Sequence, residues 1–318
     1  MRPQLFSLIL AAFVLGAFPS IALAQETAPA KPQDEEKTEL YRKYYEGAKG
    51  SPEQQKAAYD IAREYLKKYG GDSDQYVTAV RKWVAKYEAA TRVADFNQAV
   101  AAKDYTKTFT VGHQLLEQDP ENFPILLQLV QAGVLNARAG NKSLNTETIA
   151  LARKSLQLVD SKKVTDPAPM ASMDDVRGFL NFSLASLLQE TAPVEAIAAF
   201  QRAAKEGGAY KTDPTTYFLL GGTIYNAEYQ PVAAEYSEKY AGKDETPESK
   251  AMLEKASAIA NRAIDAVARA VALATKPEQK DLKAKWLSQL TEIYKDFHSG
   301  SEAGLNDLIA TVLSKPLP

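Results

Sequence analysis

The sequence predicts an all-α protein on three observations. Hydrophobic residues make up 45% of the chain, and Ala is the most frequent of them. Ala is the strongest helix former. Val and Ile never stand in the alternating runs that are typical of half-buried strands. Helix-start signals, with Ser, Thr or Asp before Pro or an acidic residue, recur along the chain.

The first 24 residues predict an export signal. Met1-Arg2 is followed by the almost wholly apolar stretch Leu5–Phe18 and by Ala22-Leu23-Ala24, which fits an A-x-A cleavage site. The apolar stretch is shorter than the roughly 20 residues that span a bilayer. We therefore expect cleavage near Ala24 and a periplasmic or secreted protein without a transmembrane segment, with an uncleaved anchor as the alternative.

Composition excludes several classes of protein. The sequence has no cysteine, which excludes a lipoprotein anchor, a disulfide and a thiolate metal site. Its 38 basic and 40 acidic side chains are interspersed, which argues against a nucleic-acid or anionic-membrane surface. Residues 25–35, QETAPAKPQDE, lack apolar periodicity and predict a flexible tether.

Helix boundaries follow from capping signals. Ser51-Pro52 with Gln54, Ser172 with Asp175, Asp213-Pro214 and Thr246-Pro247 each predict a helix start. Gly70-Gly71 predicts the end of the helix that begins at Pro52. The expected helices span residues 37–48, 52–69, 74–102, 104–118, 122–138, 146–160, 173–190, 193–206, 214–226, 229–240, 247–274, 278–297 and 302–313.

Small and aromatic residues repeat with helical spacing in the middle of the chain. Ala196, Phe200 and Ala203 share one helix face at i, i+4 and i+7, and Tyr217, Leu220 and Gly221 suit a helix approached closely by another backbone. Pro120 marks a helix boundary. Together these motifs resemble the tetratricopeptide (TPR) repeat family. The spacing between equivalent positions is longer and less regular than the family's roughly 34 residues.

The resemblance implies an all-α, right-handed superhelix, a solenoid of antiparallel helix pairs with extra N- and C-terminal helices. The expected organisation is a signal at 1–24, a tether at 25–35, an N-terminal helical cap at 36–83, repeats at 84–241 and C-terminal helices at 242–318, including one long helix. An irregular helical bundle is the alternative fold.

In this family, the concave groove binds peptides or partner helices. Carrying over the positions that face it gives a set of candidate binding residues: Asn97, Gln131, Asn181, Phe218, Tyr225 and Asn226. Amides can hydrogen-bond a peptide backbone, and exposed rings supply apolar contact area. The alternative is that Phe218 and Tyr225 are core side chains and that the Asn residues cap helices. The N-terminal tyrosines are expected to pack the cap rather than to face a ligand.

The sequence offers little for catalysis. His113 and His298 lie in no metal-ligand spacing, and Asp174-Asp175 follows Ser172 as helix N-terminal charges. We therefore expect no cofactor, no metal and a non-catalytic scaffold whose partner is another envelope or secreted protein, with the oligomeric state open. The alternatives are an envelope assembly or secretion-complex factor and a carbohydrate-acting enzyme or sugar-binding protein.

Overall fold

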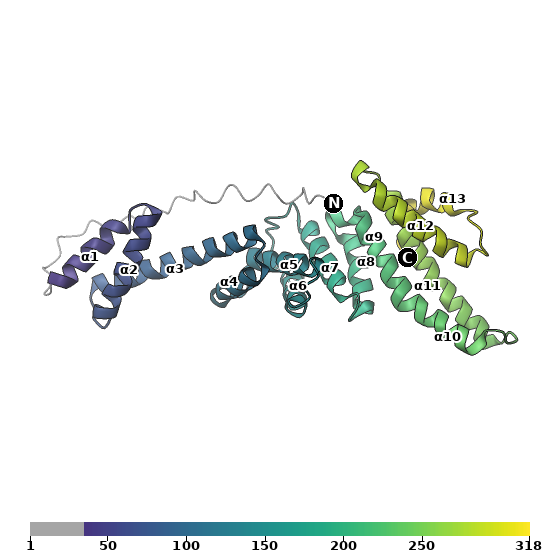
Figure 1. Ribbon diagram of the computed structural model, residues 1–318, viewed down its shortest axis with the longest axis horizontal. Helices are drawn as coiled ribbons and strands as arrows, with labels where there is room; N and C mark the ends of the chain where they lie inside the picture. The colour runs from purple at the N-terminus through teal and green to yellow at the C-terminus, as the bar shows by residue number, and fades with distance from the viewer. Residues whose placement is uncertain (1–34) are drawn as a thin grey trace. The chain divides into compact units, whose positions relative to one another are not determined.

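The computed structural model describes residues 35–318, and this part of the chain is all-helical, without a strand. The expected signal at 1–24 and most of the tether at 25–35 lie outside the described residues. Contacts divide the described chain into two compact units, residues 35–118 and residues 119–318 (Figure 1). The division falls within the range 84–241 that was expected to form a repeat array. No helix within 35–318 is long and apolar enough to cross a membrane.

The first unit contains four helices, and each packs against the next: α1 (Glu35–Gly47), α2 (Pro52–Tyr69), α3 (Gln75–Ala102) and α4 (Tyr105–Gln118). Ser51 caps α2 in a complete capping box with Gln54, as the sequence predicts. Asp74 caps α3 by accepting a hydrogen bond from the Val77 N–H at 2.9 Å.

Aromatic side chains build the core of this unit. Tyr44 and Tyr65 are buried with Val77, Val80 and Val84. Tyr41 meets Tyr76 edge to face, with ring centroids 4.9 Å apart. Burial raises the pKa of Tyr65 to about 12. Within the described structure, Tyr44 and Tyr65 are therefore packing residues.

The second unit begins with the helices α5 (Phe123–Arg138), α6 (Asn145–Asp160), α7 (Met173–Leu188) and α8 (Pro193–Glu206). They are followed by α9 (Pro214–Ile224), a π-helical turn η2 (Tyr225–Tyr229), α10 (Gln230–Tyr240), α11 (Pro247–Leu273), α12 (Lys280–Phe297) and α13 (Leu305–Thr311). Successive helices pack in chain order from α5 to α9, and α11 then packs against α9, α10, α12 and α13.

The small and aromatic residues of the repeat-like motifs lie in this unit's interior. In α8, the side chains of Ala196, Phe200 and Ala203 have no exposed surface. In α9, Leu220 and Gly221 are also buried. Tyr217 is 6% exposed. Phe200 meets Phe182 of α7 edge to face at 5.8 Å. Pro120 is exposed in the turn between α4 and α5.

Glycine allows two of these helices to touch. A Cβ built at Gly221 would lie 2.6 Å from Val267 Cγ2 and 2.9 Å from the Ala263 carbonyl oxygen, both on α11. No side chain fits at such distances, so the approach of α9 to α11 depends on Gly at this position.

The expected break between residues 226 and 229 is wrong, because the helix continues from Pro214 to Tyr240 through η2. The Gln230 N–H bonds to the Tyr225 carbonyl oxygen, five residues earlier, which defines the π turn. Pro231 follows directly, and its ring would conflict with an ordinary α-helical carbonyl four residues back. The wider turn accommodates Pro231. The long helix pairs with α11 as one hairpin, which we call the α9–α11 hairpin.

Candidate functional site

The candidate groove residues lie on several helices of both units. Asn97 is exposed on α3 of the first unit, and Gln131 is half-buried on α5 of the second. Asn181 lies on α7. Phe218, Tyr225 and Asn226 follow one another along α9 and η2, and of these three Asn226 is exposed. These last three residues are the part of the candidate set that shares one element.

Asn181 is buried, unlike a residue that faces an open groove. It is 3% exposed, its amide donates to the Arg177 carbonyl oxygen at 2.9 Å, and its carbonyl accepts from Arg202 Nε at 2.9 Å. A buried amide must have such partners. Asn181 therefore joins α7 to α8 and is a packing residue in this structure.

Of the aromatic candidates, Phe218 contacts helix α12 directly, and Tyr225 is connected to it through Tyr229. Phe218 stacks on Trp286 with centroids 4.9 Å apart. Tyr225 stacks on Tyr229, whose ring meets Phe297 edge to face at 4.9 Å. Burial and the nearby Asp296 carboxylate raise the pKa of Tyr225. Phe218 of α9 and Tyr229 of η2 thus contact aromatic side chains of α12, while Asn226 stays exposed.

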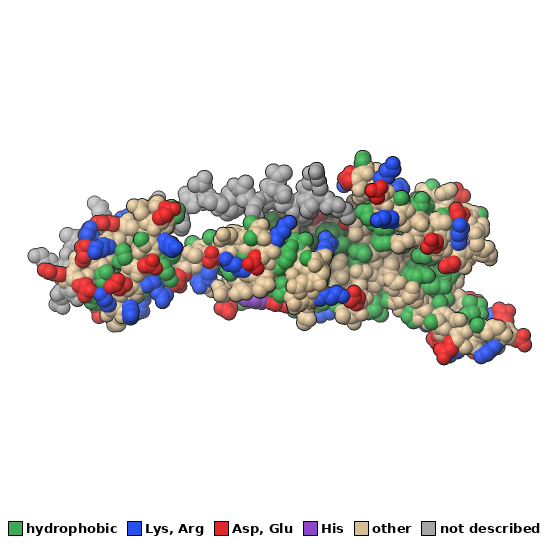
Figure 2. All heavy atoms as spheres, viewed as in Figure 1, with side chains coloured by type: hydrophobic (Ala, Val, Ile, Leu, Met, Phe, Trp, Pro, Cys, Tyr) green, Lys and Arg blue, Asp and Glu red, His purple; other side chains and the backbone are tan. Residues whose placement is uncertain are grey.

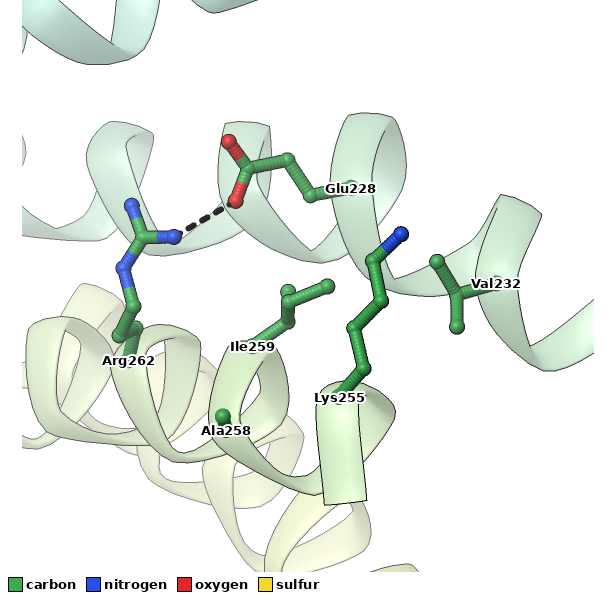
Figure 3. A pocket seen from close by; sticks show the side chains of 6 residues that line it. All are labelled: Glu228, Val232, Lys255, Ala258, Ile259 and Arg262. Carbon is green, nitrogen blue, oxygen red and sulfur yellow. Dashed lines mark hydrogen bonds and ion pairs between the residues drawn. The ribbon is translucent and has the colours of Figure 1, made fainter. Parts of the chain in front are cut away.

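An open pocket of about 450 Å³ lies between two segments of the α9–α11 hairpin (Figure 3). One wall comes from η2 and α10, and the other comes from α11. Its walls are Glu228, Val232, Lys255, Ala258, Ile259 and Arg262. Glu228 and Arg262 form an ion pair at 2.8 Å, and both are partly exposed. The Lys255 side chain extends toward α10 (Figure 3). Two cations and one carboxylate give the pocket a net positive charge over an aliphatic floor.

The outer half of the α9–α11 hairpin is poorly buried. None of the residues Gln230–Tyr240 of α10 is buried. Val232, Tyr236 and Tyr240 share one side of α10 at i, i+4 and i+8 and are half-exposed. By contrast, α11 is almost continuously buried from Ala263 to Val271. Val232, Tyr236 and Tyr240 with the adjoining pocket are called the hairpin surface below.

Acidic and basic side chains both gather at the tip of the hairpin in the view of Figure 2. On α10, Glu235 and Lys239 form an ion pair whose charged atoms lie 2.5 Å apart. Charged side chains therefore border the hairpin surface, whose aromatic residues Tyr236 and Tyr240 run to the end of α10.

Within residues 35–318, no group of three or more His, Asp or Glu side chains is placed to hold a metal ion. His298 stacks on Tyr294, and its Nδ1 lies 2.8 Å from the Tyr294 carbonyl oxygen. The Asp175 carboxylate accepts from the Ala209 N–H and the Ser172 hydroxyl at the start of α7. The carboxylate that could have suggested acid-base chemistry is thus engaged at a helix terminus.

Sequence reasoning did not single out Glu228, Lys255 or Arg262. The π turn adds a residue to one helical turn and so changes which side chains of the following helix face α11. A 3.6-residue period assumed across residues 225–229 cannot place Glu228 or Val232. The Pro231 that follows was the one available signal.

The comparisons with known proteins add no relative: no protein-family model, curated protein or solved structure matches this chain significantly.

Proposed function

We propose that this chain is an exported, non-catalytic scaffold that binds a partner protein, and that the partner docks on the hairpin surface. The observation that carries the proposal is that the apolar row Val232, Tyr236 and Tyr240 of α10 is only partly covered and that none of this helix's residues is buried. Aromatic side chains that are apolar on the ring and polar at the tip are enriched in protein interfaces.

Charge indicates the kind of partner. Lys255 and Arg262 outnumber Glu228 in the pocket beside the aromatic residues. A segment with apolar side chains over Tyr236 and an acidic side chain toward Lys255 would match this arrangement. Such pairing steers association more than it adds affinity. An acidic, amphipathic helix or peptide of another envelope or secreted protein is therefore the partner class that we propose.

Two further features belong to the proposal. The in-order packing of α5 to α9 and the buried motif of Ala196, Phe200 and Ala203 support a TPR-like stack of helix pairs. The basic start, apolar stretch and A-x-A site of residues 1–24 support export. The proposed docking surface differs from the concave groove that the family resemblance implies, and the choice is supported by the contact of Phe218 with Trp286 of α12.

The test is capture of the partner by the secreted chain from an envelope extract. A photo-reactive phenylalanine analogue replaces Tyr236, and crosslinked proteins are identified by mass spectrometry. We expect one dominant crosslinked protein, reduced at least tenfold by Val232→Asp or by Lys255→Glu, because these changes disturb the apolar contact and reverse the charge. The matched control is Val194→Asp on α8, a residue that is 74% exposed and outside the hairpin surface. Equal capture by all variants would contradict the assignment.

A further inference from the structure

A buried arginine on α11 holds the backbone of the segment Lys315–Pro318. Arg269 is 5% exposed and pairs with Asp265 at 2.6 Å. Its Nη2 donates to the carbonyl oxygens of Lys315 at 2.9 Å and of Pro316 at 2.8 Å. Asp265 therefore holds the guanidinium in place through Nε, while Nη2 donates to the carbonyl oxygens of two consecutive residues.

The segment itself is exposed apart from one leucine. Lys315 has extended backbone angles, and Lys315, Pro316 and Pro318 are exposed. Leu317 is half-buried and packs against the apolar cluster that includes Ala268 and Val271 of α11. Gln201 of α8 reaches the Pro318 carbonyl oxygen at 3.5 Å. These polar contacts from Arg269 and Gln201 end on backbone carbonyl oxygens, and Leu317 supplies the apolar contact.

This set of contacts defines a chemical specificity. Carbonyl oxygens are present in every peptide, so Arg269 and Gln201 select an extended backbone rather than particular side chains. Proline at the positions on either side of the leucine holds the backbone extended before binding, which lowers the entropy lost on binding. The contact area under Leu317 selects one apolar side chain. The ligand class is therefore an extended segment with a leucine between two prolines.

We propose that Arg269, Gln201 and the apolar surface under Leu317 form a binding site for such proline-flanked segments, which the chain's own residues Lys315–Pro318 occupy. A partner's segment of the same chemistry must displace them, so the occupied site is autoinhibited. The site is separate from the hairpin surface and stands whether or not a partner docks there.

Energetics favour exchange over an empty site. When Lys315–Pro318 leaves, Arg269 Nη2 loses two acceptors while the guanidinium remains paired with Asp265, and a peptide that supplies two carbonyl oxygens restores these hydrogen bonds. The segment is held by few contacts, so its release is easier than that of a packed helix. Its attachment to the chain gives it an effective concentration on the order of millimolar, with which a free peptide must compete.

The experiment uses the full chain carrying Leu317→Asp, which removes the apolar anchor and leaves Arg269 untouched. The probe is a fluorescent peptide with the sequence of residues 314–318 and capped ends, and its binding is followed by anisotropy. The amide of residue 317 is followed by ¹⁵N relaxation. We expect this amide to become mobile in the variant. The probe should bind the variant with a dissociation constant below about 1 mM and the parent chain at least tenfold more weakly.

Two changes test the site residues, and the helical content and melting temperature of each variant are measured alongside. Adding Arg269→Gln to Leu317→Asp should abolish probe binding. Gln201→Ala, on the surface of α8, should weaken it about twofold to fivefold, in line with one weak hydrogen bond. Because the Arg269→Gln change alters a buried ion pair, Arg269→Lys serves as a second variant that keeps the charge and loses the planar fork. We expect it to weaken binding at least fivefold.

The controls on the peptide are the reversed sequence and the same peptide with Asp in place of leucine, neither of which should bind. Three results would overturn the proposal. The first is absence of saturable binding to the Leu317→Asp chain. The second is binding that neither Arg269 substitution changes in a folded chain. The third is a residue 317 amide that stays rigid after the substitution, since the leucine would then not be the anchor of an exchangeable segment.

Discussion

At the scale of the residue, helix packing in this protein depends on where a side chain is missing. Gly221 and Gly222 are neighbours on α9 with opposite surroundings. A Cβ at Gly221 would lie 2.6 Å from Val267 Cγ2, whereas a Cβ at Gly222 would meet nothing within 4 Å. The same substitution therefore has opposite effects at the two positions, and this makes the pair a sensitive test of the α9–α11 approach.

Gly221→Ala should destabilise the chain by about 1–3 kcal/mol, because α9 or Val267 must move to accept the methyl group. Gly222→Ala should stabilise it by about 0.5–1 kcal/mol, because Ala loses less backbone freedom in a helix than Gly. Urea unfolding followed by circular dichroism measures both free energies of unfolding. Equal effects at the two positions would mean that α9 and α11 are farther apart than described.

Residue identity alone could not separate packing from binding roles. The burial of Ala196, Phe200 and Ala203 could be predicted from the sequence. Small and aromatic residues at i, i+4 and i+7 are typical of a close helix contact. The burial of Asn181 could not be predicted in this way. An amide serves equally well in a groove or between helices, and its partner Arg202 lies on the next helix, where no local period relates the two.

At the scale of the element, helix starts were predictable and one helix end was not. Capping is local: Ser51, Ser172 and Thr246 each accept a hydrogen bond from the backbone N–H three residues later. The expected stop near Asn226 was wrong, because the π turn makes room for the ring of Pro231 and the helix continues. That choice depends on whether α11 lies alongside, which is tertiary information.

Asp175 connects two elements and gives a pH-dependent prediction. Its carboxylate accepts from the Ala209 N–H at 2.8 Å and from the Ser172 hydroxyl at 2.7 Å, and these hydrogen bonds hold its pKa below the ordinary value. A lowered pKa in the folded state stabilises the fold above the unfolded-state pKa of about 3.9. This stabilisation is lost as the pH falls through the lower, folded-state pKa.

Asp175→Asn should therefore lower the free energy of unfolding at pH 7 by about 1–2 kcal/mol. Its stability should also fall less steeply than that of the parent chain when the pH drops below about 4. Urea unfolding between pH 2.5 and pH 7 measures both effects. Asp174→Asn is the matched control, because this neighbouring side chain is 66% exposed and lies 3.7 Å from Arg177. If both variants share the parent's pH profile, the Ala209 contact does not stabilise the fold.

At the scale of the whole molecule, each of the two units contains an apolar core cluster of its own. Tyr44, Tyr65 and the valines of α3 form a cluster that lies wholly within residues 35–118. Another cluster, centred on α11 and Trp286, lies wholly within residues 119–318. Composition and capping predicted the all-α class. They did not predict the division after Gln118, because unit boundaries depend on which helices contact one another and not on local pattern.

Because these core clusters lie in different units, we expect the two units to unfold locally at different rates. Tyr65→Ala removes a fully buried ring and should destabilise the first unit by about 3–5 kcal/mol. Hydrogen exchange followed by mass spectrometry should show faster exchange in α2 and α3 and unchanged exchange in α7 and α8. Tyr65→Phe is the control: the hydroxyl is buried and has no hydrogen-bond partner within the described part of the chain, so its removal should leave stability equal or higher. If Tyr65→Ala accelerates exchange equally in α2 and α8, the chain unfolds as one cooperative unit, and the two cores are coupled despite sharing no residue.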